Sequence, residues 1–137
     1  MQPEKHIAIE RSIFYKMIQH CIKSSPQIAA GMLAGSKTTV EVVEIMRSLE
    51  IECCDPTNEM IECMETKSRL LSRGHRPLAI FRCHKSGNAL PTQYEIETYS
   101  DPNILLIIVS LQHGGVPLVK AYEIAAAQAA PVRIEVE

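Results

Sequence analysis

Two continuously apolar runs bracket one polar stretch, and this arrangement constrains the fold more than any other feature of the sequence. Leu78–Phe81 and Ile104–Val109 carry no polar residue, which is typical of strands buried on both faces. We therefore expect each run to form a strand, the second of them a central buried strand of a sheet. The stretch between them, which begins FRCHKSGNALPTQYE at Phe81, holds most of the candidate functional residues.

Periodicity predicts the remaining elements. Apolar residues recur at helical spacing along Arg11–Lys23, which predicts an amphipathic helix. A second helix is expected over Thr66–Ser72, ended by Arg73-Gly74, and a short third helix near Thr92. Strands are expected over Ile7–Ile9, Ile28–Ala34, Thr39–Met46, Leu49–Cys54, Met60–Met64, Leu78–Cys83, Ile104–Leu111, Leu118–Ile124 and Val132–Val136. This order predicts an α+β fold with a mixed sheet flanked by helices.

Length and composition fit a single domain spanning residues 1–137. A chain of this size buries roughly two thirds of the surface that its unfolded form exposes, enough for one core. Hydrophobic content of 46% and charged content of 22% are ordinary for a globular protein. The net charge of −2 and the scarcity of aromatic residues, 4%, argue against a nucleic-acid partner.

The sequence also predicts a protein without membrane segments. Ile104–Val109 is too short to cross a bilayer, and Met1–His6 contains no apolar signal segment. The five cysteines lack the spacing of a disulfide framework or of a C-x-x-C metal site, so we expect a reducing cytoplasm and buried cysteines that pack as small hydrophobes. They are Cys21, Cys53, Cys54, Cys63 and Cys83.

The polar stretch places several chemical groups in a defined order. Side chains alternate along a strand, so Arg82 and His84 should share one face while Cys83 points to the other. Thr92 and Glu95 follow Pro91 with the spacing of a helix capping box.

This spacing resembles the signature of the JAB/MPN family, the JAMM zinc metallopeptidases, which reads His-x-His, seven residues, Ser, two residues and Asp. The resemblance aligns Arg82 and His84 with the two histidines, Thr92 with the serine and Glu95 with the aspartate. The segment 31–35, GMLAG, is similar to the family's Gly-x-Leu-x-Gly strand. The resemblance covers essentially the whole chain and implies a JAB/MPN-like, cytidine-deaminase-like fold.

In that family, two histidines and a carboxylate hold zinc, a glutamate acts as general base and the serine stabilises the oxyanion. This chain departs from the pattern at two positions. Arg82 has no lone pair for a metal, and Ile28, or Gln27 if the register moves by one, replaces the glutamate. We therefore expect no metal cofactor, with zinc required only if the protein is active.

The expected role of Arg82 is to replace the metal by pairing with Glu95, which leaves His84 and Glu95 as vestigial ligands and Thr92 at the oxyanion position. Alternatively, Arg82 points to solvent and His84 is an ordinary, partly buried histidine. Glu95 could instead serve the capping box, in competition with Arg82.

Glu41 and Glu44 present a further alternative. They could supply a replacement base, although exposed strand positions fit them better.

Three functions remain open. The first is a catalytically inactive binding or assembly module, which the resemblance implies could self-associate or pair with another JAB/MPN domain. The second is an active zinc metallopeptidase with a rearranged site, trimming the C-terminal tail of a ubiquitin-like or sulfur-carrier protein. In the third, Arg82, Lys85 and Gln27 bind a carboxylate-bearing ligand or tail without cutting it, the tail adding a strand at a sheet edge.

Overall fold

The structure is a computed structural model that describes residues 5–23, 30–36, 39–46, 56–84, 87–99, 101–111 and 116–137. The strands within these ranges are β1 (His6–Ile9), β2 (Ala30–Ser36), β3 (Thr39–Ile45), β4 (Arg76–His84), β5 (Leu105–Ser110), β6 (Leu118–Ala125) and β7 (Gln128–Val136). The helices are α1 (Arg11–Lys23), α2 (Pro56–Ser72) and α3 (Gln93–Thr98). Strands and helices thus form one α+β unit, as the sequence predicts.

The sheet closes into a barrel in the order β1-β3-β2-β4-β5-β6-β7. β1 closes it, because this short strand pairs in parallel with β3 on one side and with β7 on the other. Beyond the strands, Arg11 donates its backbone N–H to the carbonyl of Glu137 at 2.8 Å, and Glu137 donates to Ile9 at 2.9 Å. The prediction of a sheet merely flanked by helices is therefore wrong, since the first and last strands join the sheet's two ends.

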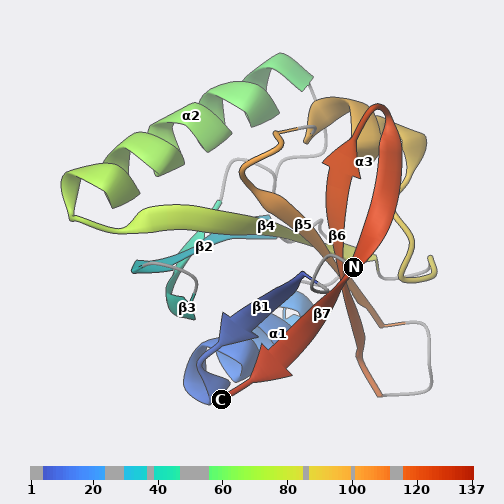
Figure 1. Ribbon diagram of the computed structural model, residues 1–137, viewed down its shortest axis with the longest axis horizontal. Helices are drawn as coiled ribbons and strands as arrows, with labels where there is room; N and C mark the ends of the chain where they lie inside the picture. The colour runs from blue at the N-terminus through green and yellow to red at the C-terminus, as the bar shows by residue number, and fades with distance from the viewer. Residues whose placement is uncertain are drawn as a thin grey trace.

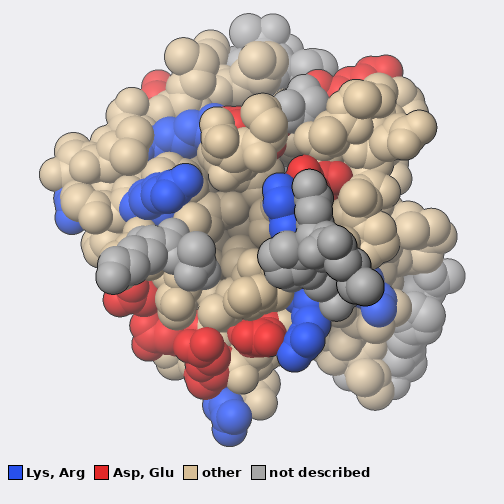
Figure 2. Space-filling view, viewed as in Figure 1, with Lys and Arg blue, Asp and Glu red and all other residues tan. Residues whose placement is uncertain are grey.

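The helices cover different parts of the barrel (Figure 1). α2 lies across β4 and β2, and α3 lies near β5, close to the end of β4. On β3, Glu44 forms ion pairs with Arg69 of α2 and with Arg73, just after its end, at 3.4 Å and 3.3 Å. Figure 2 shows basic side chains over the α2 region, acidic ones below them, and charges of both signs elsewhere on this face.

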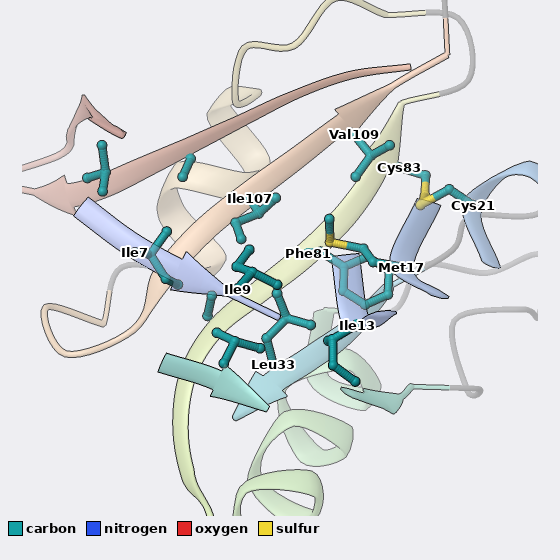
Figure 3. Close-up of a cluster of buried hydrophobic side chains, with 14 residues drawn as sticks. Ile7, Ile9, Ile13, Met17, Cys21, Leu33, Phe81, Cys83, Ile107 and Val109 are labelled. Carbon is teal, nitrogen blue, oxygen red and sulfur yellow. A yellow bond between two sulfur atoms is a disulfide. The ribbon is translucent and has the colours of Figure 1, made fainter. Parts of the chain in front are cut away.

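Buried side chains form two clusters, one on each face of the sheet. Alternation along β4 separates them, because Phe81 and Cys83 belong to the first cluster and Ile80 to the second. The first cluster joins the apolar face of α1 to the barrel strands, as Figure 3 shows for Met17 beside Phe81. The second includes residues of α2, such as Leu70, packed on the opposite face.

One predicted element has the wrong type, and one lies outside the described residues. Met60–Met64, expected to be a strand, belongs to α2, which begins at Pro56 rather than Thr66. Leu49–Cys54 lies outside the described ranges. The end of α2 is confirmed, since Gly74 adopts a φ of +80°, a conformation that glycine accepts without a Cβ penalty. Among the described helices, none is long and apolar enough to cross a membrane.

Cys21 and Cys83 form a disulfide between α1 and β4. Their Cα atoms lie 5.7 Å apart, although the residues are separated by 62 positions in the sequence. Burial of Cys21, Cys63 and Cys83 is confirmed, but treating all the cysteines as small hydrophobes is wrong for the bonded pair. Sequence spacing gave no sign of it, because the fold alone brings α1 against the end of β4. Cys53 and Cys54 lie outside the described residues.

Candidate functional site

The last residues of β4 carry the candidate site. Arg82 pairs in register with Ala30 of β2 and Ile108 of β5, and His84 pairs with Ser110. The predicted alternation is confirmed, because Arg82 and His84 both reach the same carboxylate while Cys83 points into the first core cluster.

The segment after β4 is fastened by hydrogen bonds to the barrel. Ser110 of β5 donates to the carbonyl of Gly87 at 2.7 Å. Tyr122 of β6 donates to the carbonyl of Ala89 at 2.5 Å, and burial raises the pKa of this tyrosine. These hydrogen bonds hold the segment that precedes α3 against β5 and β6.

α3 begins with the predicted capping box, which is confirmed. The N-cap residue Thr92 accepts from the backbone N–H of Glu95 at 3.2 Å, and the Thr92 N–H donates to Glu95 Oε1 at 2.9 Å. Two donors at the helix start are thereby satisfied. The cap also fixes the Glu95 side chain, which turns back towards β4.

Glu95 is the centre of a buried ionic cluster. Arg82 Nε lies 2.8 Å from Glu95 Oε2, and His84 Nε2 lies 2.9 Å from each carboxylate oxygen. The Nε–H of Arg82 is not aligned for a hydrogen bond, so this contact is an ion pair by distance. Arg82 is 7% exposed and Glu95 1% exposed. The predicted pairing of Arg82 with Glu95 is present, and the alternative of a solvent-directed Arg82 is wrong.

Competition between Arg82 and the capping box does not arise. Oε1 of Glu95 accepts from the Thr92 backbone, while Oε2 faces Arg82. A carboxylate has lone pairs enough for both roles. One residue therefore caps α3 and neutralises charge on β4.

Two tyrosines complete the surroundings of Arg82. The guanidinium carbon lies 5.4 Å from the ring centroids of both Tyr94 and Tyr99, within the range of cation–π attraction. Nη1 of Arg82 also donates to the Tyr99 hydroxyl at 2.9 Å. Sequence analysis missed both tyrosines. Tyr99 follows Glu95 by four residues, one helical turn, and that spacing could have revealed it.

The hydrogen bonds of His84 favour its charged form. Nδ1 lies 2.7 Å from the carbonyl oxygen of Asn88, which can only accept, and Nε2 faces the carboxylate of Glu95. The hydrogen bond with Glu95 raises the pKa of His84, while burial opposes this effect. Burial by itself would raise the pKa of Glu95, but hydrogen bonds from His84 and Thr92 hold that pKa below its ordinary value.

These residues do not fit a zinc ion. A ligand must offer a lone pair, which the guanidinium of Arg82 lacks. Nε2 of His84 is directed at Glu95, whose two oxygens already face donors from three residues. Over the described ranges, no group of three His, Cys, Asp or Glu side chains could hold a metal.

The remaining candidate residues either lie outside the described residues or have partners elsewhere. Gln27, Ile28 and Lys85 lie outside the described residues, so their roles stay predictions. Glu41 accepts a hydrogen bond from Ser36 of its own hairpin. Glu44 pairs with Arg69 of α2 and with Arg73 just after it, so the structure gives both carboxylates partners other than the cluster residues.

Comparison with solved structures shows which known fold this architecture resembles. No family model and no curated protein matches the sequence. A protein from Desulfitobacterium hafniense, solved in solution, is similar at a TM-score of 0.73 and 22% identity, covering 96% of this chain and 92% of that one. A JAB1/MPN domain protein from Archaeoglobus fulgidus gives 0.64 and 14%, covering 96% of each chain. The chain has a JAB/MPN-like fold.

A third structure with the JAB/MPN-like fold is described as a JAMM metalloprotease-like zinc site in the proteasome and signalosome. It gives a TM-score of 0.59 at 13% identity and covers 97% of this chain and 100% of that one. The fold implied by the sequence motifs is thus confirmed. At these identities the similarity extends to the fold, and the zinc site named for that protein is a property of that protein.

Proposed function

We propose that this chain is a catalytically inactive JAB/MPN-like domain that serves as a protein-binding or assembly module. One observation carries the proposal: the Glu95 carboxylate is engaged by Arg82, His84 and Thr92 at 2.8–2.9 Å. A carboxylate held in this way is a structural centre, because no oxygen is left to a metal or to a proton-transfer step without breaking an existing contact.

Charge supports the same proposal. Arg82 is positively charged, and the hydrogen bond with Glu95 raises the pKa of His84, so both side chains offset the charge of one buried carboxylate, as a bound cation would. The side chains therefore supply electrostatically what a metal would supply. They cannot supply a Lewis acid or an activated water.

Zinc binding tests the proposal most directly. The purified wild-type chain, incubated with zinc and desalted, should contain no stoichiometric zinc by elemental analysis. Arg82→His should gain zinc affinity, because it restores two imidazoles and a carboxylate on one face. Arg82→Lys is the matched control. It keeps the positive charge but adds no lone pair that could bind a metal, so it should remain zinc-free.

Activity separates this proposal from the peptidase alternative. Neither the wild-type chain nor Arg82→His should cleave a ubiquitin-like protein extended beyond its Gly-Gly tail, since position 27 or 28 lacks the glutamate base. Chelator-sensitive cleavage by the wild-type chain, abolished in His84→Ala, would overturn the proposal and establish a rearranged zinc peptidase.

Partner choice can be measured with the same protein. Titration with a ubiquitin-like or sulfur-carrier protein tests tail recognition, and sedimentation at increasing concentration tests pairing with a second copy. Binding of the tail that is lost when Lys85 and Gln27 are changed to alanine would identify a recognition module. Self-association without tail binding would identify an assembly module.

A further inference from the structure

The disulfide occupies a specific place relative to the ionic cluster. Cys83 is the residue between Arg82 and His84 on β4, so its backbone is shared with both of them. Cys21 lies in the last turn of α1. The bond therefore ties the end of α1 to the strand end that presents the cluster, from the opposite face of the sheet (Figure 3).

Packing around the two sulfur atoms is tight. Cys21 is fully buried and Cys83 is 6% exposed, in a cluster that also contains Met17, Phe81 and Val109. His20, next to Cys21, makes an edge contact with the ring of Phe81 at a centroid distance of 6.3 Å. A sulfur atom in such surroundings has little room to swing away without moving its backbone.

Reduction would require movement at this point. Two reduced thiols cannot stay within bonding contact, so the sulfurs must move apart in surroundings that are already packed. The cluster on the other face depends on contacts of 2.8–2.9 Å from the residues on both sides of Cys83. A displacement of Cys83 would be passed through the backbone to Arg82 and His84 and would lengthen these contacts.

We propose that the Cys21–Cys83 disulfide is a redox-operated tether that holds the end of β4, and that its reduction loosens the Arg82–Glu95–His84 cluster. The reductant is a dithiol. One of its thiolates attacks a cysteine sulfur, the S–S bond breaks, and a mixed disulfide forms. Its second thiolate then releases the protein thiol, so the dithiol leaves as a disulfide and its two protons end on Cys21 and Cys83.

The inference does not depend on the proposed function, because its readouts need neither zinc nor a partner. The first readout is covalent. Alkylation of the unfolded, unreduced chain followed by peptide mass mapping should find Cys21 and Cys83 unmodified and joined. Both residues should be alkylated only after a dithiol has been added. Alkylation of both before reduction would overturn the proposal.

The second readout is local order. Amide hydrogen exchange at Arg82, Cys83 and His84 should accelerate by roughly tenfold or more after reduction, while β6 amides stay nearly unchanged. Cys21→Ala should reproduce the reduced state and respond no further to the dithiol. Cys63→Ala, buried but outside the bond, should behave as wild type.

If Cys21→Ala does not fold, the reduced wild-type chain gives the same comparison against its own oxidised form. Equal exchange at Arg82 and His84 in both redox states would show a purely structural bond and would sink the tether proposal. That result would leave the metal-free binding module standing, since it rests on the donors around Glu95.

Discussion

Glu95 meets three structural demands with two oxygens. It closes the capping box with Thr92, balances the charge of Arg82 and accepts from His84, all at 1% exposure. A buried charge with one partner is often a net cost, whereas additional hydrogen bonds offset the loss of hydration. The cluster should therefore behave as a unit.

Removing one member should expose this coupling. Arg82→Met should destabilise the protein by about 3 kcal/mol, because it leaves the buried carboxylate with less compensation. The double variant Arg82→Met/Glu95→Gln should lose less than the sum of the single variants, with a coupling of at least about 1 kcal/mol. Urea unfolding of all four proteins measures the cycle. Additive losses would show that the pair is not coupled.

The capping role predicts a smaller effect. Thr92→Ala should lower the free energy of unfolding by about 1 kcal/mol, since a six-residue helix loses its N-cap. Gln93→Ala is the matched control, because Gln93 is exposed and its side chain donates a hydrogen bond to Glu97 in the same helix, a pair worth a few tenths of a kcal/mol. In thermal unfolding, Thr92→Ala should lower the melting temperature more than Gln93→Ala does. Equal losses would contradict the cap as the cause.

At the scale of single residues, the sequence revealed roles that follow from spacing along the chain. It missed contacts that depend on how the fold brings separate segments together. Alternation on β4 predicted that Arg82 and His84 share a face, and spacing predicted the capping box, whereas the pairing of Arg82 with Glu95 was predicted from the resemblance to the metal-site signature. The carbonyl of Asn88 that orients His84 could not be predicted, because the path of the chain after β4 depends on bonds to β5 and β6.

At the scale of elements, α2 shows why one helix was only half predicted. Its first part places Met60, Ile61 and Met64 at 47–64% exposure, so apolar residues lie on the outer face as well as the inner one. Helical periodicity is blurred where both faces are apolar. Strands β4 and β5 were predictable because burial on both faces leaves an unbroken apolar run.

The glycine-containing strand β2 makes a separate prediction. A Cβ at Gly31 would collide with the ring of Phe81 on β4 and approach the carbonyl oxygen of Glu44 to 2.9 Å. Gly31→Ala should therefore destabilise the protein by about 2 kcal/mol through overpacking. At Gly87 the three atoms nearest to an added Cβ belong to His84, at 3.6 Å or more, so Gly87→Ala should cost less than about 0.5 kcal/mol. Chemical denaturation compares the two, and similar losses would refute the steric account.

For the whole molecule, closure of the sheet was the least predictable feature. β1 and β7 come from opposite ends of the described chain and pair over four registered positions. Each strand can be predicted from its own apolar pattern, but neither pattern indicates which strand it pairs with. The order of helices and strands along the sequence therefore predicts the α+β class but does not predict that the sheet closes into a barrel.

Global stability should depend on pH through the cluster. The pKa of His84 is raised from 6.5, so its contribution is fully present below pH 6.5 and is lost as pH rises through the folded-state value. The pKa of Glu95 is lowered from 4.5, so its contribution is present above pH 4.5 and is lost on acidification through the folded-state value. The two terms together should be largest between about pH 4.5 and 6.5.

Urea midpoints measured across this range provide the test. His84→Gln should remove most of the decline on the alkaline side and leave the remaining carboxylates to titrate in acid. An unchanged alkaline decline in the variant would assign that dependence to other groups.

Barrel closure also bears on how the protein tolerates high concentration. Unpaired strand edges are the usual route by which sheets join edge to edge and aggregate, and a closed sheet conceals most of them. β1 pairs with β3 only at Thr39 and Val40, so the outer edge of β3 beyond Val40 is not covered by β1. Glu41 lies exposed on that stretch, and its charge would repel the same edge of an approaching copy, protecting the protein where its barrel is least complete.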